Sequence, residues 1–214
     1  MKLPLVNILG WFCAIALLTA CSKDDDDYVP PYQIDMLEVS TDADGMLSWV
    51  KLDDGSIYDV SAQKKMSEAP DTTLRCRGSY TLNHGKMTLY GVAAVFADKP
   101  VPASAFTVVI NGVPHRGSEY LPRDPVKLVS MWKSGGYINL QLGVMTTGYG
   151  IHQYAFCEEA PGLYSLVHLH PFSDASSYTE QVYMSMPIPE GVEEPTFILK
   201  TYDGVYKRTF LNQE

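Results

Sequence analysis

The chain consists of short runs in which apolar and polar side chains alternate with a period of two, interrupted by glycine, proline and Asx-Gly pairs. Successive side chains of a β-strand point to opposite faces of the sheet, so this alternation is typical of strands with one buried face. Little sustained helical periodicity accompanies it. We therefore predict an all-β fold.

Residues 33–112 contain five such runs and a sixth shorter one. Asp53-Asp54-Gly55 and Asn83-His84-Gly85 each supply a glycine that tolerates the positive φ of a tight hairpin turn. Five or six short strands suit a small OB-like barrel, because closure of the sheet removes exposed edges. The expected strands are 33–40, 46–52, 56–61, 73–82, 86–96 and 106–111.

Residues 113–124 are interrupted by glycines and prolines and are interpreted as a linker. The remaining residues, 125–214, contain about seven alternating runs, and Asp203-Gly204 indicates a terminal hairpin. Regularly spaced antiparallel strands of this kind predict a β-sandwich. The expected strands are 126–132, 137–142, 152–158, 163–170, 181–188, 196–202 and 205–211.

Residues 1–20 are interpreted as a secretory signal peptide. The apolar run 5–18 follows a single lysine, and as a helix it would span about 21 Å, short of a bilayer core of about 30 Å. Leu18-Thr19-Ala20-Cys21 resembles a bacterial lipobox. The resemblance implies that Cys21 carries lipid, such as palmitate, and begins the mature protein, anchoring it to a membrane. An ordinary signal peptide with a chance cysteine is the alternative.

Residues 21–32 are interpreted as a tether. They include four adjacent aspartates, 24–27, whose carboxylates repel one another and stay solvated. The tether is similar to the acidic export signal of surface lipoproteins in gut-dwelling Gram-negative anaerobes. That similarity implies an outer-membrane protein facing the cell exterior, whereas a plain linker would also allow the periplasmic face. The residues of the expected signal are Ser22, Lys23, Asp24, Asp25, Asp26 and Asp27.

The charge balance argues against nucleic acid as a partner. The chain has 16 basic and 25 acidic residues, a net charge of -9, and therefore lacks a broad cationic surface. No nucleophile elbow or phosphate-binding loop occurs, so we expect neither an enzyme nor a cofactor. Cys76 and Cys157 lie in strand-like runs, which favours two separate buried thiols over a disulfide.

Six residues are candidates for ligand binding. OB folds bind ligands on a sheet face by stacking and positive charge, and outside the cell a glycan or peptide is the more plausible ligand. Two further aromatic residues, Trp132 and Tyr137, flank Ser134-Gly135-Gly136 and could line a binding loop. Core or cross-strand packing of the aromatic residues and surface placement of the arginines is the alternative. The candidates are Trp49, Tyr58, Arg75, Arg77, Trp132 and Tyr137.

His168 and His170 are two positions apart on an expected strand, so both would point to one face. Such a pair could bind a metal ion, with Asp174 or His152 as a third ligand. The alternative is a pair of surface or half-buried histidines, with no metal.

The order and spacing of several segments resemble the NigD-like lipoproteins, a family named from a bacteriocin-associated operon. The resemblance implies an OB-like N-terminal domain and a C-terminal β-sandwich, and it supplies no catalytic residue. The segments are the lipobox with its acidic tail, Asp54-Gly55, Asp124-Pro125-Val126, the run from Trp132 to Asn139, Ser185-Met186-Pro187-Ile188 and Lys200-Thr201-Tyr202-Asp203-Gly204.

Three functions are consistent with these features. The first is a non-enzymatic lipoprotein that binds an extracellular glycan, peptide or protein. The second is a protein of bacteriocin immunity or production, which rests on the family name. The third is a metal-dependent hydrolase, which rests on His168 and His170.

Overall fold

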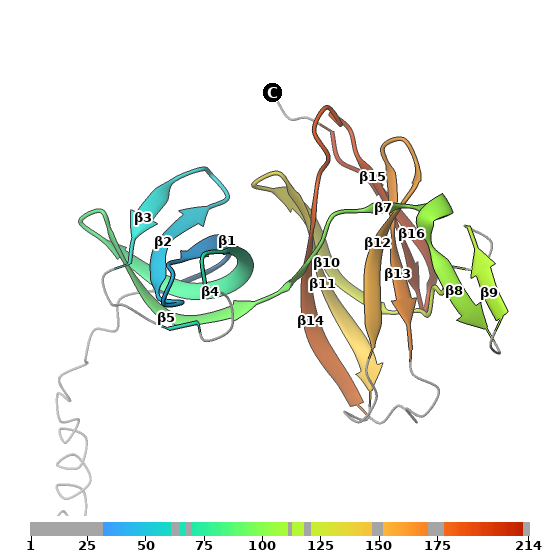
Figure 1. The fold of residues 1–214 in the computed structure, drawn as a ribbon, viewed down its shortest axis with the longest axis horizontal. Helices are drawn as coiled ribbons and strands as arrows, with labels where there is room; N and C mark the ends of the chain where they lie inside the picture. The colour runs from blue at the N-terminus through green and yellow to red at the C-terminus, as the bar shows by residue number, and fades with distance from the viewer. Residues whose placement is uncertain are drawn as a thin grey trace, which may run out of the picture. The chain divides into compact units, whose positions relative to one another are not determined.

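The structure is a computed structural model that describes residues 32–60, 65–66, 70–110, 113–117, 121–146, 152–170 and 178–211. In these ranges the chain consists of strands and turns, with one 3₁₀ helix, η1 (Ala103–Ala105), and no α-helix. The predicted all-β fold is confirmed (Figure 1). The predicted signal peptide, Cys21 and the acidic residues after it lie outside the described residues.

The N-terminal strands form one curled sheet with the order β3-β2-β1-β4-β5. A parallel bridge between Val60 and Met87 links the end of β3 to β5, so the two outer strands approach each other as in an OB-like barrel. Its buried core includes Leu37, Val50 and Cys76. The strands are β1 (Gln33–Thr41), β2 (Leu47–Leu52), β3 (Ile57–Asp59), β4 (Thr73–Asn83) and β5 (Lys86–Ala94).

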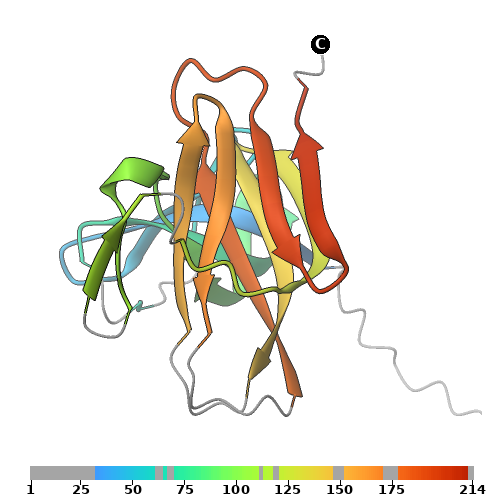
Figure 2. The same cartoon turned by 90° about the vertical axis from the view of Figure 1, so that its right-hand side faces the viewer.

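Two further sheets form the C-terminal sandwich, whose strands are seen from the side in Figure 1 and after a quarter turn in Figure 2. The first has the order β10-β11-β14-β6, with β6 (Phe96–Ala97), β10 (Lys127–Ser134), β11 (Tyr137–Thr146) and β14 (Tyr178–Pro187). The second has the order β16-β15-β13-β12-β7, with β7 (Val101–Pro102), β12 (Gln153–Ala160), β13 (Leu163–Leu169), β15 (Thr196–Thr201) and β16 (Gly204–Thr209).

The sandwich core is formed by inward-facing side chains of both sheets. The alternation predicted for Ile138, Leu140, Leu142 and Val144 is confirmed, since all four are buried in one hydrophobic cluster. The opposite sheet contributes Phe156, Tyr164, Phe197 and others to the same cluster. Burial of this continuous apolar surface is what holds the two sheets together.

The residues after β5, expected in the barrel domain, pair with strands of the sandwich. Strand β6 pairs in parallel with β14, and β7 pairs in parallel with β12, so residues 96–102 belong to the sandwich sheets rather than to the barrel. The sixth expected strand corresponds to β8 (Thr107–Ile110), which pairs with β9 (Val113–Arg116) inside the expected linker. Strands of two residues are too short to show alternation, so the sequence carried no signal for β6 and β7.

The two cysteines of the described residues are separate thiols, as predicted. Cys76 lies in the barrel core, and Cys157 lies beside Leu121 and Val167 in the sandwich. Burial raises the pKa of the Cys76 thiol to about 12 and that of Cys157 to about 11. Both side chains therefore remain protonated and act as small apolar residues.

Candidate functional site

Arg75, for which the sequence suggested a ligand-binding face or a surface position, is buried at the junction between barrel and sandwich, with 6% of its surface exposed. Its guanidinium binds both carboxylate oxygens of Asp53, through Nη1 at 2.5 Å and Nη2 at 2.8 Å. Asp53 belongs to the turn between β2 and β3. The expectation of a solvent-facing arginine is wrong because the sandwich covers this face of β4.

Three side chains of the sandwich complete the surroundings of Arg75. Nη2 donates to Asn139 Oδ1 at 3.2 Å, and Nε donates to Ser185 Oγ at 3.3 Å. Ser134 donates to Asp53 Oδ2 at 2.5 Å and accepts from Asn139 Nδ2 at 2.9 Å. Each buried polar side chain of this network has a partner, and the Asp53 carboxylate compensates the charge of Arg75.

A second contact crosses the junction at Tyr137. Its hydroxyl donates to Glu38 Oε1 at 2.7 Å, and the Arg75 guanidinium lies 4.1 Å from the centre of its ring. Burial, together with the hydrogen bond to Glu38, raises the pKa of Tyr137 to about 12. Tyr137 is therefore a neutral donor that fixes β11 of the sandwich against β1 of the barrel.

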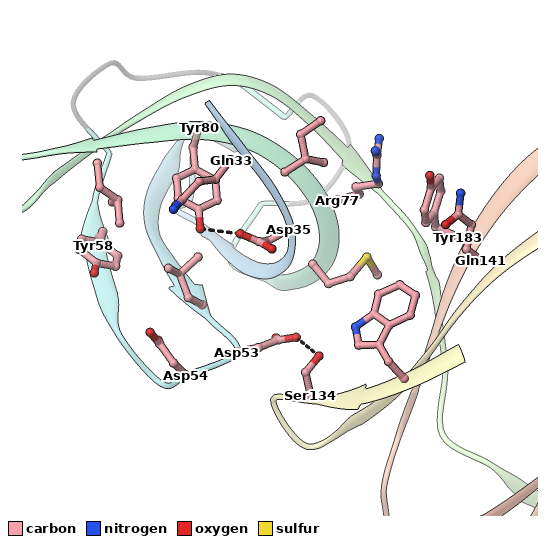
Figure 3. A pocket seen from close by; sticks show the side chains of 15 residues that line it. Gln33, Asp35, Asp53, Asp54, Tyr58, Arg77, Tyr80, Ser134, Gln141 and Tyr183 are labelled. Carbon is pink, nitrogen blue, oxygen red and sulfur yellow. Dashed lines mark hydrogen bonds between the residues drawn. The ribbon is translucent and has the colours of Figure 1, made fainter. Parts of the chain in front are cut away.

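Beside this network lies a cleft of about 660 Å³, lined by 15 residues (Figure 3). One wall comes from β1, β3, β4 and the β2–β3 turn, and the other from β10, β11 and β14. The volume is within the range of roughly 300–1,000 Å³ that is typical of small-molecule sites. Aromatic rings and carboxylates line it together, and Figure 3 shows Tyr58, Asp54 and Tyr183 around the space.

Two carboxylates of the cleft are held in place by hydrogen bonds. Tyr80 is almost fully buried, and its hydroxyl donates to Asp35 Oδ2 at 2.8 Å. Burial is the main cause, and this hydrogen bond the second, of a pKa of Tyr80 well above its usual value. Asp54 accepts from the backbone N–H of Ser56 at 2.8 Å, and this bond lowers the pKa of Asp54. Both carboxylates are thus acceptors with a fixed orientation.

The six sequence candidates for ligand binding divide into three groups in the structure. Tyr58, Arg77 and Trp132 line the cleft. Arg75 and Tyr137 lie in the junction network next to it. Trp49 is half-buried in β2, opposite Ser40 and Asp59, and does not line the cleft. The candidates from the barrel strands and those that flank Ser134-Gly135-Gly136 therefore lie around the same cleft, with Trp49 as the exception.

Sequence reasoning missed the polar partners that build this site. Asn139 and Ser185 are register partners on β11 and β14. Each lies on the strand face opposite the apolar alternation, so the pattern alone predicts solvent exposure. Both are instead fully buried. The sequence offered one indication of their role. Asn139 and Ser185 both lie in segments that carry the NigD-like resemblance, 132–139 and 185–188.

The expected histidine pair belongs to a group of three imidazole rings in the sandwich. His168 Nδ1 lies 3.0 Å from the carbonyl oxygen of Asp124, and His168 Nε2 lies 3.0 Å from His152 Nδ1. A carbonyl only accepts, so Nδ1 of His168 carries the proton and His152 donates to Nε2. His170 Nε2 lies 3.1 Å from the carbonyl oxygen of Met145. Burial lowers the pKa of His168, which keeps it neutral.

This arrangement does not direct the candidate ligands His168 and His170 at a shared metal position. Nδ1 of His168 carries the proton, and the Nε2 lone pair of His168 accepts from His152. Among the residues that the structure describes, no group of three or more His, Cys, Asp or Glu side chains could hold a metal ion. Asp174, one expected third ligand, lies outside the described residues.

Comparisons with known proteins give matches at the level of structure. No family model and no curated protein matches the sequence. A NigD-like immunity protein from Bacteroides caccae has a TM-score of 0.63 and 21% identity, covering 87% of this chain and 100% of that chain. The chain has the fold of that NigD-like protein. The predicted resemblance is confirmed in the fold.

Two other solved structures are similar. A candidate toxin-related protein from Parabacteroides distasonis has a TM-score of 0.65 and 15% identity, covering 85% of this chain and 94% of that chain. A candidate lipoprotein from Bacteroides fragilis has a TM-score of 0.50 and 9% identity, covering 84% and 96%. Within the described ranges, the protein has no helix with the length and hydrophobicity that a bilayer crossing requires.

The described segments that suggested the NigD-like resemblance lie in two places in this fold. Asp54-Gly55 share a turn with Asp53, which accepts from Ser134 of segment 132–139, and Ser185 of segment 185–188 accepts from Arg75 at the same junction. The segments 124–126 and 200–204 meet elsewhere, where Val126 N donates to the carbonyl of Lys200 at 3.2 Å. Both groups of segments thus make contacts between distant parts of the chain.

Proposed function

We propose that this protein is a lipid-anchored envelope protein that binds an extracellular ligand in the cleft between barrel and sandwich and catalyses no reaction. The observation that carries the proposal is the cleft itself, whose two walls are joined by the buried Arg75 network. A site whose walls are fixed before binding loses less entropy when the ligand enters. The rigid junction therefore favours a binding role for the cleft.

Binding rather than catalysis is supported by the chemistry of the lining residues. The Ser134 hydroxyl donates a hydrogen bond to Asp53, but Arg75 already neutralises the charge of Asp53, so this carboxylate is a poor base for activating the serine. Asp35 is occupied by the Tyr80 hydroxyl on one oxygen. These groups are arranged to hold hydrogen bonds rather than to transfer protons.

The anchor in this proposal is lipid on Cys21, with Ser22 to Asp27 directing the protein to the exterior of the outer membrane. Protease shaving of intact cells tests this location. The native protein should be digested, whereas a variant with Asp24, Asp25, Asp26 and Asp27 replaced by alanine should be protected. If the native protein is protected, it faces the periplasm and the search for ligands moves there.

The binding role is tested with purified lipoprotein in detergent, applied to an array of glycans and to an array of peptides. The native protein should retain at least one class of ligand above background. A Tyr58→Ala variant should lose that ligand, because Tyr58 lines the cleft. No binding to either array, or binding that the variant keeps, would remove the cleft as a binding site.

A second candidate function is immunity to a bacteriocin. It is favoured by the shared fold with a NigD-like immunity protein and with a candidate toxin-related protein. A strain lacking the gene should become sensitive to a bacteriocin from a competing strain, and the intact gene should restore resistance. Unchanged sensitivity across a panel of competitor supernatants would argue against this function.

A further inference from the structure

The cleft presents flat aromatic surfaces on both of its walls. Trp132 of β10 and Tyr183 of β14 come from the sandwich, and Tyr58 of β3 comes from the barrel. All three are half-buried, so their rings are supported by packing while part of each surface is accessible. The Arg77 guanidinium lies over the Tyr183 ring, 4.5 Å from its centre, and covers one face of that ring. Flat apolar faces of a ligand could stack on these walls.

Polar groups of mixed character surround these rings. Asp35 and Asp54 are acceptors, Arg77 is a donor, and the amides of Gln33 and Gln141 can do both (Figure 3). The acceptors are oriented by Tyr80 and by the backbone of Ser56, as described above. A ligand rich in hydroxyl groups, each both donor and acceptor, matches this set.

The charges of the cleft nearly cancel. Asp53 is neutralised by Arg75, which leaves Asp35 and Asp54 against Arg77, a net charge of −1. The two carboxylates disfavour an anion, and a cation would gain only the attraction of this one net charge. Asp35 and Asp54 are also exposed, and ion pairs at such positions contribute little. Stacking and neutral hydrogen bonds are therefore the main interactions on offer.

We propose that the cleft binds a neutral oligosaccharide, whose ring faces stack on Trp132 and Tyr58 and whose hydroxyls bond to Asp35, Asp54 and the glutamines. This inference rests on the proposed binding function and names the ligand class. A peptide carrying basic side chains is the competing ligand, because it would also find aromatic rings and carboxylates. The two ligands differ in how binding responds to salt.

The experiment uses the full-length lipoprotein in detergent against neutral glycans, charged glycans and basic peptides on arrays, followed by titration of the best ligand. A neutral glycan should bind, and its Kd should change less than twofold between about 0.05 M and 0.5 M NaCl, since screening acts only on charges. Trp132→Ala should weaken binding about tenfold or more, as loss of a central aromatic contact does. Trp132→Phe should restore most of it.

A matched control is Tyr206→Ala, which removes an exposed aromatic residue of β16 that does not line the cleft. It should leave the Kd unchanged, and thermal melting of all variants verifies that each is folded. A basic peptide whose salt-sensitive binding is lost in Trp132→Ala would overturn the oligosaccharide and leave the cleft as a binding site. A ligand bound equally by native protein and Trp132→Ala, or no ligand at all, would overturn both proposals.

Discussion

Gly135 lies so close to Asp53 that a Cβ atom built on Gly135 would overlap the carboxylate. Gly135 and Gly136 form the turn between β10 and β11, and both have positive φ, at 58° and 81°. The turn thereby brings the sandwich within reach of the barrel at the residue that pairs with Arg75. A glycine is required there for two reasons, its backbone conformation and its lack of a side chain.

Replacing Gly135 by alanine should destabilise the protein by more than the same change at Gly136. Each variant incurs the cost of a left-handed backbone, about 1 kcal/mol. Only Gly135→Ala also displaces Asp53, which adds about 1–3 kcal/mol. A Cβ added at Gly136 would meet no atom within 4 Å, which makes Gly136→Ala the control. Urea unfolding measures both, and equal losses would contradict the close contact.

Arg75→Met should lower the free energy of unfolding by about 3–5 kcal/mol, because it leaves the Asp53 carboxylate without its counter-charge and removes one donor from Asn139 Oδ1. Arg77→Met is the control, since Arg77 is half-buried and makes no ion pair with the described residues. It should cost less than about 1 kcal/mol. Similar urea midpoints for the two variants would show that the Arg75 network contributes no more than a surface charge.

The unfolding free energy should fall as the pH drops below about 6.5, the ordinary pKa of histidine. His168 has its pKa lowered by burial, so the unfolded chain binds a proton at a higher pH than the folded chain does. The contribution of neutral His168 to the unfolding free energy is fully present above the pKa that this residue has in the unfolded chain. It is lost as the pH falls toward the lower pKa of His168 in the folded protein. Protonation of Nε2 would also set two donors against each other at His152.

Thermal melting between pH 5 and pH 8 measures this effect. A His168→Gln variant should be less stable at pH 8 and should lose less stability on acidification than the native protein does. His84→Asn, at an exposed turn position with φ of 49°, should keep the native pH dependence. A native profile that is flat between pH 5 and pH 7 would contradict the assignment.

Neither Cys76 nor Cys157 should react with iodoacetamide at pH 8 while the protein is folded. Burial raises the two pKa values to about 12 and about 11, and the thiolate is the reactive form. Mass spectrometry should detect no label on either residue of the native protein and two labels after unfolding in urea. Rapid labelling of the folded chain would show that one of these strands opens readily.

The strands of this protein could be predicted where burial follows a simple alternation. Ile138, Leu140 and Leu142 alternate with other residues and face one core, so their strand and its buried face were evident. Arg75 shows the same alternation in β4 and yet is buried, because the second face of that strand is covered as well. A pattern of period two describes one buried face and says nothing about the other.

The candidate site could be predicted only in part, because its polar contacts join distant residues. Arg75 bonds to Asp53, Asn139 and Ser185, which are 22, 64 and 110 positions away in the chain. Aromatic residues such as Trp132 and Tyr58 stand out in a sequence as candidates for ligand binding, and both line the cleft. Asp35 and Gln141 carry no such signal, and only the fold places them opposite one another.

The short strands β6 and β7 determine which fragments of the chain could pair all of their strands. All strands of the barrel sheet lie between Gln33 and Ala94, so this sheet finds every partner within one continuous stretch. Phe96 of β6 pairs instead with Met184, and Val101 of β7 pairs with Cys157, both far along the chain. A fragment that ended after β7 would therefore contain the complete barrel sheet and two strands without their partners.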